Sequence, residues 1–309
     1  GSIGGVPFTD AEINSGDLRE AVYAARGSAR TDADRAIRML QATPLAPSFG
    51  ALFAGLSASG PVQAEVAMFL PIKDFERRVI TVMANLDGVT LRTRQQPIEA
   101  SDVRGTLWVR NREIQAPALA GRALGGRFDA SIATTLLGGG NLRTRIDAQG
   151  SLQGAALAPI ARMPANAGLA GATDWRGTLE LERDADPKQP ARGTVRLSSD
   201  LRGLASALPE PFAKTAEAAR PLALSATFGG VNSPRIEGSL GRDVRALLQL
   251  HGSSGATPVE RGIVTFGGAT PDALPANAGL WLTGRLEAAS LTKILDLQWS
   301  GPRDRKSTR

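Results

Sequence analysis

The sequence lacks cysteine altogether and contains a single histidine, His251, among 309 residues. Without cysteine there is no disulfide framework and no thiolate metal site. One histidine alone cannot build a zinc site or a nucleophile–histidine pair of recognisable spacing. We therefore predict that the protein is not an enzyme and has no catalytic residue, no metal site and no cofactor. We expect His251 to be an exposed strand residue.

Aromatic residues are scarce, at 5%, although the net charge is +6. Surfaces that bind nucleic acid interleave basic residues with aromatic side chains on which the bases stack. In this sequence the arginines occur singly, mostly at alternate positions of apparent strands. The pattern argues against nucleic acid as a partner, and a basic surface that faces anionic lipid headgroups fits it as well.

Long hydrophobic runs are also missing. The most apolar region, residues 42–71, is interrupted by proline and glycine and falls short of the roughly 20 apolar residues that a membrane-spanning helix needs. No signal peptide is recognisable. Because the chain does not begin with Met, we interpret it as an internal piece of a longer protein, with any membrane anchor outside it.

The dominant pattern that is present has a period of two. In "LRTRIDAQG", Leu142 and Ile146 face one way while Arg143 and Arg145 face the other. Such alternation predicts strands with one apolar and one wet face, and the glycine, proline, asparagine and aspartate between them indicate an antiparallel meander. Helix is predicted only in short pieces, near Asp32–Ala42 with Thr31 as the cap, and near Pro47–Leu56.

A degenerate unit recurs along these strands, with the common core x-G-[TSR]-[LV]-x. It reads "VRGTLWV" from Val103, "WRGTLEL" from Trp175, "ARGTVRL" from Ala191, "IEGSLGR" from Ile236 and "LTGRLEA" from Leu282. Each unit puts its glycine and the Leu or Val two residues on toward the same face. Because a missing side chain lets backbone or ligand approach closely, we predict that this face is concave and crowded.

Other conspicuous residues are more simply explained by structure than by chemistry. The segments "ALGGRF" and "LLGGGN" are glycine-rich but do not lead into a helix, which predicts turns and not phosphate-binding loops. Asp184 and Asp186 lie in a polar, turn-rich stretch typical of a solvated loop. The four tryptophans fit either packing within the sheet or contact with an apolar channel or headgroup region; they are Trp108, Trp175, Trp281 and Trp299.

Four ordered blocks resemble the AsmA-like superfamily, and more specifically its YhdP branch of Gram-negative bacteria. They are "DRAIRMLQATPLAPSFGALFAGL" with the strands after it, "VRGTLWVRNREIQAPALAGRALGGRFDASI", "LRGLASALPEPFAKTAEAARPLALSATFGG" and "ANAGLWLTGRLEAASLTKILDL". The resemblance covers roughly Val6 to Trp299. The final "SGPRDRKSTR" departs from it, and nothing is carried over to that segment.

The resemblance implies a fold, a location and a function. The fold is mainly β: a long, strongly twisted antiparallel sheet curled into an apolar groove, with one or two short helices. We expect residues 1–299 to form one continuous AsmA-like groove segment, with a soft boundary near 150–175, and 300–309 to be a disordered tail. The family's implied place is the periplasm of the cell envelope. The implied partners are phospholipid acyl chains and the inner membrane, which is reached through an anchor outside this fragment. The implied function is lipid transport toward the outer membrane, in support of its permeability barrier.

The apolar phase of each strand gives the predicted groove lining. These residues are Leu107, Val109, Phe128, Ile132, Ile146, Leu179, Leu181, Val195, Leu197, Leu224, Phe228, Leu248 and Leu286. The opposite, wet side is predicted to carry Arg104, Arg110, Arg143, Arg145 and Arg196. A second reading stays open, in which the apolar face belongs to a structural scaffold of the envelope and binds protein partners that the sequence does not identify.

Overall fold

The computed structural model describes most of the chain. The described residues are 2–3, 6–15, 22–41, 55–71, 73–74, 77–93, 98–160, 163–164, 166–186, 189–229, 233–251, 259–267, 270–271 and 273–285. The predicted tail at 300–309, Trp299, Leu286 and residues 47–54 of the second predicted helix lie outside them.

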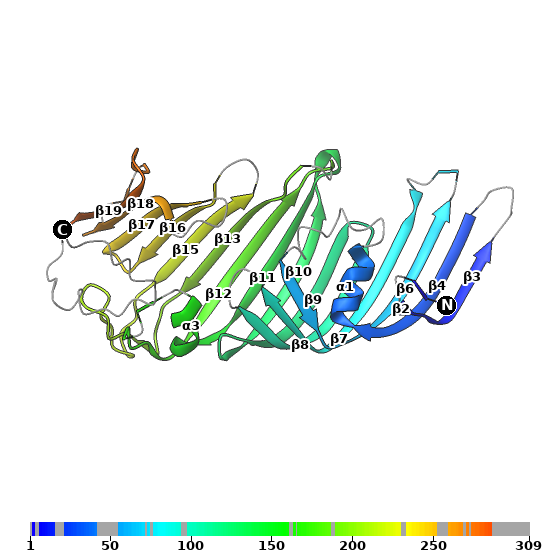
Figure 1. Cartoon of the computed structure of the whole chain (residues 1–309), viewed down its shortest axis with the longest axis horizontal. Helices are drawn as coiled ribbons and strands as arrows, with labels where there is room; N and C mark the ends of the chain where they lie inside the picture. The colour runs from blue at the N-terminus through cyan, green and yellow to red at the C-terminus, as the bar shows by residue number, and fades with distance from the viewer. Residues whose placement is uncertain are drawn as a thin grey trace, which may run out of the picture.

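The described residues form β-strands almost throughout, as the period-two pattern predicts (Figure 1). The strands of the N-terminal half are β1 (Ser2–Ile3), β2 (Val6–Pro7), β3 (Thr9–Ser15), β4 (Val22–Asp32), β5 (Leu56–Ser59), β6 (Pro61–Pro71), β7 (Val79–Thr93), β8 (Glu99–Arg110), β9 (Glu113–Ala123) and β10 (Gly126–Leu136). Those of the C-terminal half are β11 (Leu142–Gln153), β12 (Ala170–Arg183), β13 (Arg192–Ser199), β14 (Leu204–Ala205), β15 (Leu222–Gly229), β16 (Arg235–Leu240), β17 (Val244–Leu250), β18 (Val259–Phe266) and β19 (Gly279–Gly284).

Apart from the small β1–β2 pair, the strands belong to a single hydrogen-bonded sheet. Its order is β3-β4-β6-β7-β8-β9-β10-β11-β12-β13-β15-β16-β17-β18-β19, and β5 and β14 add short pairings to β7 and β12. All neighbours are antiparallel except β18 and β19, which run parallel. A parallel pair needs a crossover connection of a dozen or so residues, and residues 267–278 supply it. Among the described strands, β3 and β19 do not pair, so the sheet is open and they are its edges.

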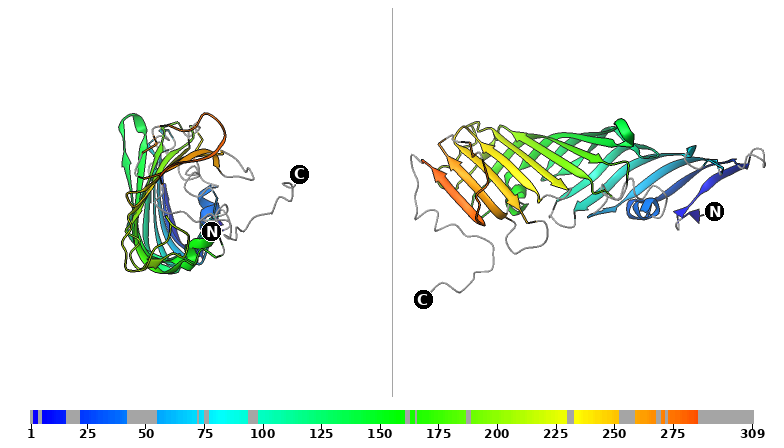
Figure 2. Two further views of the ribbon diagram at one scale, coloured as in Figure 1. Left: turned by 90° about the vertical axis from the view of Figure 1, so that its left-hand side faces the viewer. Right: turned by 90° about the horizontal axis from the view of Figure 1, so that it is seen from above.

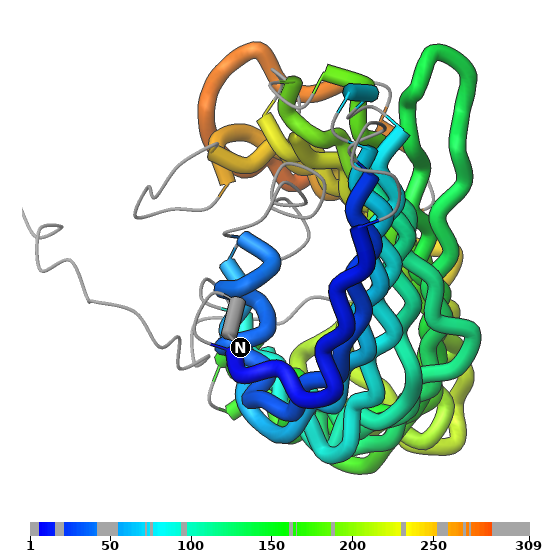
Figure 3. Tube along the Cα trace, turned by 90° about the vertical axis from the view of Figure 1, so that its right-hand side faces the viewer, coloured from blue at the N-terminus to red at the C-terminus, as the bar shows by residue number. Residues whose placement is uncertain are grey.

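The sheet is strongly twisted and curves around one side. Figure 2 shows its curved cross-section, and Figure 3 shows helix α1 (Ala33–Gln41) lying inside the curve. We call the side that carries α1 the concave face and the opposite side the outer face. A second short helix, α3 (Gly154–Ile160), packs on β11 and β12 on the same side, and the sequence analysis did not foresee it. A 3₁₀ turn at Gly138–Gly140 joins β10 to β11.

The cap of α1 differs from the prediction. Asp32, not Thr31, caps the helix, because its Oδ1 accepts the backbone N–H of Asp34 at 3.0 Å. The second carboxylate oxygen accepts the N–H of Gly60 at 2.8 Å and so ties the helix start to the β5–β6 turn. Thr31 is instead the penultimate residue of β4. The sequence pattern placed the cap one residue early because both residue types favour caps.

The second predicted helix, near Pro47–Leu56, lies outside the described residues except for its last two positions. Gly55 lies in a turn and Leu56 begins β5, which pairs with β7 through Leu56 and Thr93. Leu56 and Ala58 alternate with serines, which is the pattern of a strand.

Candidate functional site: the concave apolar face

The strand pairings divide the residues of the sheet between two faces. In an antiparallel ladder, residues directly opposite each other point to the same side. One such row runs from Ile132 through Ile146 and Leu179 to Val195. The next row runs from Ala133 through Arg145 and Glu180 to Thr194. Apolar and charged rows therefore alternate along the strands. The apolar rows point to one face of the sheet and the charged rows point to the other.

The predicted groove residues fall on one of these faces. Val109 and Ile132 belong to a hydrophobic cluster that includes Leu40 of α1, and Phe128 belongs to a second cluster that includes Ile37 of the same helix. The pairings carry this face across to β17. The remaining members on it are Leu107, Ile146, Leu179, Leu181, Val195, Leu197, Leu224, Phe228 and Leu248. Leu286 lies outside the described residues. That lipid touches these side chains stays a prediction.

The concave face is covered in one part and open in another. Under α1 the apolar side chains are buried, with Val109 only 3% exposed. Further along, Val195 and Phe228 are each 37% exposed, and Leu282 on the edge strand β19 is 65% exposed. Large apolar side chains at such exposure usually mark a surface that something else covers. The C-terminal half of the concave face is therefore the part with unsatisfied apolar surface.

Glycines opposite large side chains keep the concave face level. Phe128 pairs with Gly121 on one side and Gly150 on the other, and Phe228 pairs with Gly193. A Cβ atom added at Gly193 would lie 2.2 Å from Cζ of Phe228, so the ring occupies the space above the glycine. The aliphatic counterparts are Leu224 opposite Gly238 and Leu248 opposite Gly262.

This pairing explains the recurring x-G-[TSR]-[LV]-x unit. Rings and branched chains that lie flat on a neighbouring glycine protrude less from the sheet than they would beside another large residue. At Gly105 the close neighbour is backbone, since its φ of +140° and the 2.4 Å between an added Cβ and the carbonyl oxygen of Ala118 exclude any side chain. The predicted crowding is present, and it comes from the sheet's own side chains and backbone.

A buried polar cluster interrupts the apolar face at one end of its central strands. Thr144 is fully buried, and its Oγ1 lies 3.0 Å from Oγ1 of Thr134, which accepts the N–H of Ile114 at 3.1 Å. Arg183 Nη2 donates to Thr144 Oγ1 and to the carbonyl oxygen of Arg112, both at 3.2 Å. Burial, and secondarily the charge of Arg112, lower the pKa of Arg183.

No sequence pattern predicted this cluster. Thr144 was visible in the apolar phase of "LRTRIDAQG", but a threonine in a strand is commonplace and Arg183 is distant in the sequence. In the fold the cluster places buried hydroxyl and guanidinium groups among the apolar side chains of this face.

The family model described as "YhdP protein" matches residues 1–307 of the chain. The chain belongs to the YhdP family. Neither a curated protein nor a solved structure matches this YhdP-family chain. Within its described residues, no helix combines the length and the hydrophobicity that crossing a membrane requires.

The outer face of this YhdP-family chain carries the charged rows. The predicted arginines lie there, and Arg104, Arg143, Arg145 and Arg196 form ion pairs with carboxylates of the same or neighbouring strands. Arg143 pairs with Glu182 at 2.7 Å, while Arg196 and Arg145 share Glu180 at 3.1 and 3.4 Å. Each arginine in these pairs is about half exposed. Exposed pairs of this kind contribute about 0.2–1 kcal/mol each and chiefly keep the face wet and soluble.

Two further pairs on the outer face shift pKa values. Hydrogen bonds from Arg145 and Thr178 hold the pKa of Asp147 below its usual value. A hydrogen bond and the charge of Asp102 raise the pKa of Arg104, and Asp87 adds to the effect. These shifts follow from ordinary ion pairs on a solvated surface, and they do not create a general acid or base.

The other sequence candidates are structural where they are described. His251 is exposed and lies one residue beyond the end of β17, so it follows the strand and is not part of it. Asp184 Oδ1 accepts the N–H of Asp186 at 2.9 Å, which forms a local turn. Leu124 and Gly125, both with positive φ, make the hairpin between β9 and β10. No group of three potential metal ligands occurs in the described part of the chain.

Proposed function

We propose that this chain is a non-enzymatic segment of a lipid conduit that carries phospholipid across the periplasm between the inner and outer membranes. The observation that carries the proposal is the apolar concave face, on which side chains from β13 to β19 such as Val195, Phe228 and Leu282 stay partly exposed. Membership of the YhdP family fits an envelope protein that transports lipid. Anchoring in the inner membrane, through a segment outside this chain, belongs to the same proposal.

The energetics favour such a surface. Moving a phospholipid through water exposes its acyl chains at about 0.8 kcal/mol per CH₂ group, which for two chains of some sixteen carbons sums to about 25 kcal/mol. An apolar wall that covers the chains along the whole path removes most of that cost. No covalent step is required, which is consistent with the residues that the concave face presents.

A concave face without deep side-chain pockets suits the movement of lipid tails along it rather than the capture of one tail. A deep side-chain pocket would fix one acyl chain in place, whereas Phe128 and Phe228 lie flat over glycines of neighbouring strands. Each position along the wall then offers a lipid tail a similar apolar contact. Headgroups remain in water at the open side of the curve, and selectivity among lipids is expected to be weak.

A structural scaffold is the second candidate, and one observation favours it. The edge strand β19 is exposed along its whole length, with Leu280 at 56% and Trp281 at 49%. Exposed apolar edges pair readily with strands of another protein or segment. The scaffold reading predicts that protein, and not lipid, covers the open apolar surface.

Site-specific photo-crosslinking separates the two functions. A photoreactive amino acid at Val195 or Phe228 points to the concave face, while one at Thr194 or Thr227 points to the outer face of the same strands. We expect phospholipid-sized mass additions at Val195 and Phe228 in the full-length protein in cells, and none at the two threonines. Protein adducts in place of lipid adducts at Val195 and Phe228 would favour the scaffold, and lipid adducts without preference for a face would reject the conduit.

A further inference from the structure

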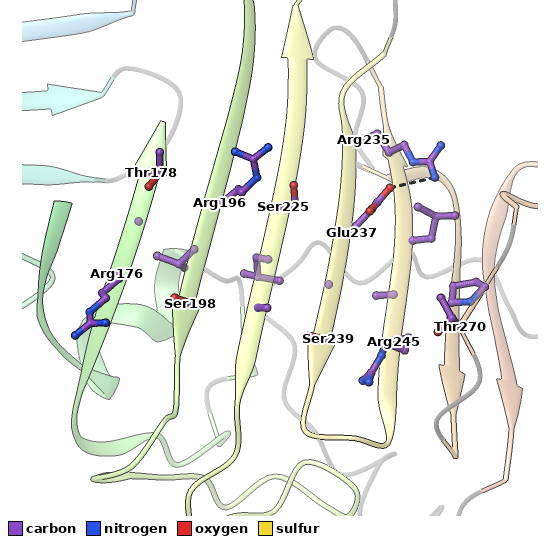
Figure 4. Close-up of a pocket in the computed structure, with 18 residues that line it drawn as sticks. Arg176, Thr178, Arg196, Ser198, Ser225, Arg235, Glu237, Ser239, Arg245 and Thr270 are labelled. Carbon is purple, nitrogen blue, oxygen red and sulfur yellow. Dashed lines mark ion pairs between the residues drawn. The ribbon is translucent and has the colours of Figure 1, made fainter. Parts of the chain in front are cut away.

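The outer face contains a trough of about 590 Å³ that the proposed lipid path does not use (Figure 4). It crosses strands β12, β13, β15, β16 and β17. Thr270 and Pro271, from the connection between β18 and β19, also line it, and Figure 4 shows Thr270 beyond Arg245 at one end. Lipid tails on the concave face are separated from this trough by the thickness of the sheet.

Three rows of cross-strand neighbours build the trough. Along its middle the side chains point away to the concave face and leave backbone exposed; this row is Gly177, Leu197, Leu224, Gly238 and Ala246. The two rows beside it point outward and form its sides. They are Arg176, Ser198, Ala223, Ser239 and Arg245 on one side, and Thr178, Arg196, Ser225, Glu237 and Leu247 on the other.

The trough carries an excess of positive charge. Its lining holds four arginines and one glutamate, Glu237, a formal balance of 4 − 1 = +3. Arg235 pairs with Glu237 and Arg196 with Glu180, each at 3.1 Å. Within the described chain, Arg176 and Arg245 form no ion pair, and Arg245 Nη1 donates only to the carbonyl oxygens of Gly241 and Val244, at 3.1 and 2.9 Å.

A neighbouring trough on the outer face lacks this excess of positive charge. It also measures about 590 Å³, shares Arg176 and Thr178 with the first, and extends over β8 to β12. Its two arginines, Arg104 and Arg176, are balanced by Asp129 and Asp147, and Arg104 also pairs with Asp102 at 2.9 Å. The same type of outer surface is therefore neutral on one side of β12 and basic on the other.

We propose that the basic trough binds an elongated anion that carries phosphate or carboxylate groups at both ends. Arg176 on β12 and Arg245 on β17 stand in the same row, four strand spacings apart, which places their backbones about 19 Å from each other. Guanidinium groups recognise both kinds of oxyanion through paired hydrogen bonds. Between them, the small side chains of Ser198, Ala223 and Ser239 leave room for the ligand, and the two serines offer hydroxyl groups to it.

Binding of linear inorganic polyphosphate to the 309-residue chain tests the proposal, measured by calorimetry at low and at physiological salt. We expect saturable binding that weakens with salt, and much weaker binding of orthophosphate, which cannot reach both arginines. Losing one charge-assisted hydrogen bond costs about 1.5–3 kcal/mol, so Arg176→Gln and Arg245→Gln should each weaken polyphosphate binding at least tenfold. Vesicles of phosphatidylglycerol, whose headgroup carries a single phosphate, form a second arm, and vesicle binding that depends on the same arginines without binding of polyphosphate would overturn the elongated anion in favour of a lipid surface.

Arg104→Gln is the matched control, because Arg104 lines only the neutral trough. It should change polyphosphate affinity less than twofold, and all three variants should keep the thermal unfolding midpoint of the parent chain. The proposal is overturned if no saturable binding occurs, if orthophosphate binds as tightly as polyphosphate, or if Arg104→Gln weakens binding as much as Arg176→Gln.

Discussion

The ring of Phe228 occupies the space above Gly193, so that a Cβ atom added to the glycine would lie 2.2 Å from the ring's Cζ and 2.5 Å from its Cε2. The two residues are direct partners in the β13–β15 ladder. Because real Cβ contacts are never that short, the pair fixes both the flat orientation of the ring and the need for glycine.

Gly193→Ala is expected to destabilise the fold by about 1–3 kcal/mol, since the ring must leave its position or the strands must separate. Equilibrium denaturation with urea measures the change. In a Phe228→Ala background the same substitution should cost much less, because the clash is gone. Gly138→Ala is the control, as nothing lies within 4 Å of its added Cβ, and it should be nearly neutral. Equal losses with and without Phe228 would contradict the packing argument.

Val195→Lys should interrupt the proposed lipid path without unfolding the sheet. Val195 is 37% exposed on the concave face, so the long side chain can carry its ammonium group to water while it disrupts the apolar wall. In the full-length protein, outer-membrane permeability should rise while the protein level stays unchanged.

Thr194→Lys is the matched control for Val195→Lys, because Thr194 points to the outer face beside Glu180. It should be silent in the same permeability assay. If both lysines act alike, or if Val195→Lys acts only by lowering abundance, the concave face is not the lipid path.

Thr144→Val should destabilise the chain by about 1–3 kcal/mol, the cost of leaving buried hydrogen-bonding partners unsatisfied. The fully buried Thr144 hydroxyl contacts Thr134 and accepts from Arg183, and valine keeps the shape while removing both contacts. Thr135→Val, on the exposed outer face opposite Arg143, is expected to change stability by less than about 0.5 kcal/mol. Thermal unfolding of the two variants side by side decides whether the polar cluster is structural.

The Asp147 carboxylate should make stability depend on pH in the acidic range. Its pKa in the folded chain lies below the unfolded value of about 4, because it accepts hydrogen bonds from Arg145 and Thr178. The folded state thus gains stability that is fully present above the unfolded pKa and is lost as the pH falls through the folded pKa.

Asp147→Asn should therefore lower stability at pH 7 and have less effect near pH 3. Since Asp147 is half exposed, the loss at pH 7 is expected to be only about 0.2–1 kcal/mol. Denaturation midpoints across the acidic range measure it, and the effect should shrink in high salt. A penalty that grows as the pH falls would have the wrong sign.

The alternation of residues by itself determined the strand content, the division into an apolar and a charged face, and the glycine-containing turns. "LRTRIDAQG" shows why: in a strand, successive side chains must point to opposite sides, so Ile146 and Arg145 are assigned to different faces before any tertiary structure is known. The predicted face of every described groove residue was derived in this way. The cap of α1 was displaced by one residue, and α3 was missed because "GAALAPI" has no polar face and a proline near its end.

Tertiary structure alone decided which strands became neighbours. It therefore also decided the contacts and surface features that join residues of different strands. The contacts of Phe228 with Gly193 and of Thr144 with Arg183 join residues 35 and 39 positions apart, and their register is set by the whole ladder. The basic trough likewise needs Arg176 and Arg245 in one row across five strands. Periodicity fixes the face of a side chain because it is a local property of the backbone. Pairing order and register are global, since they depend on how all the strands share one continuous sheet.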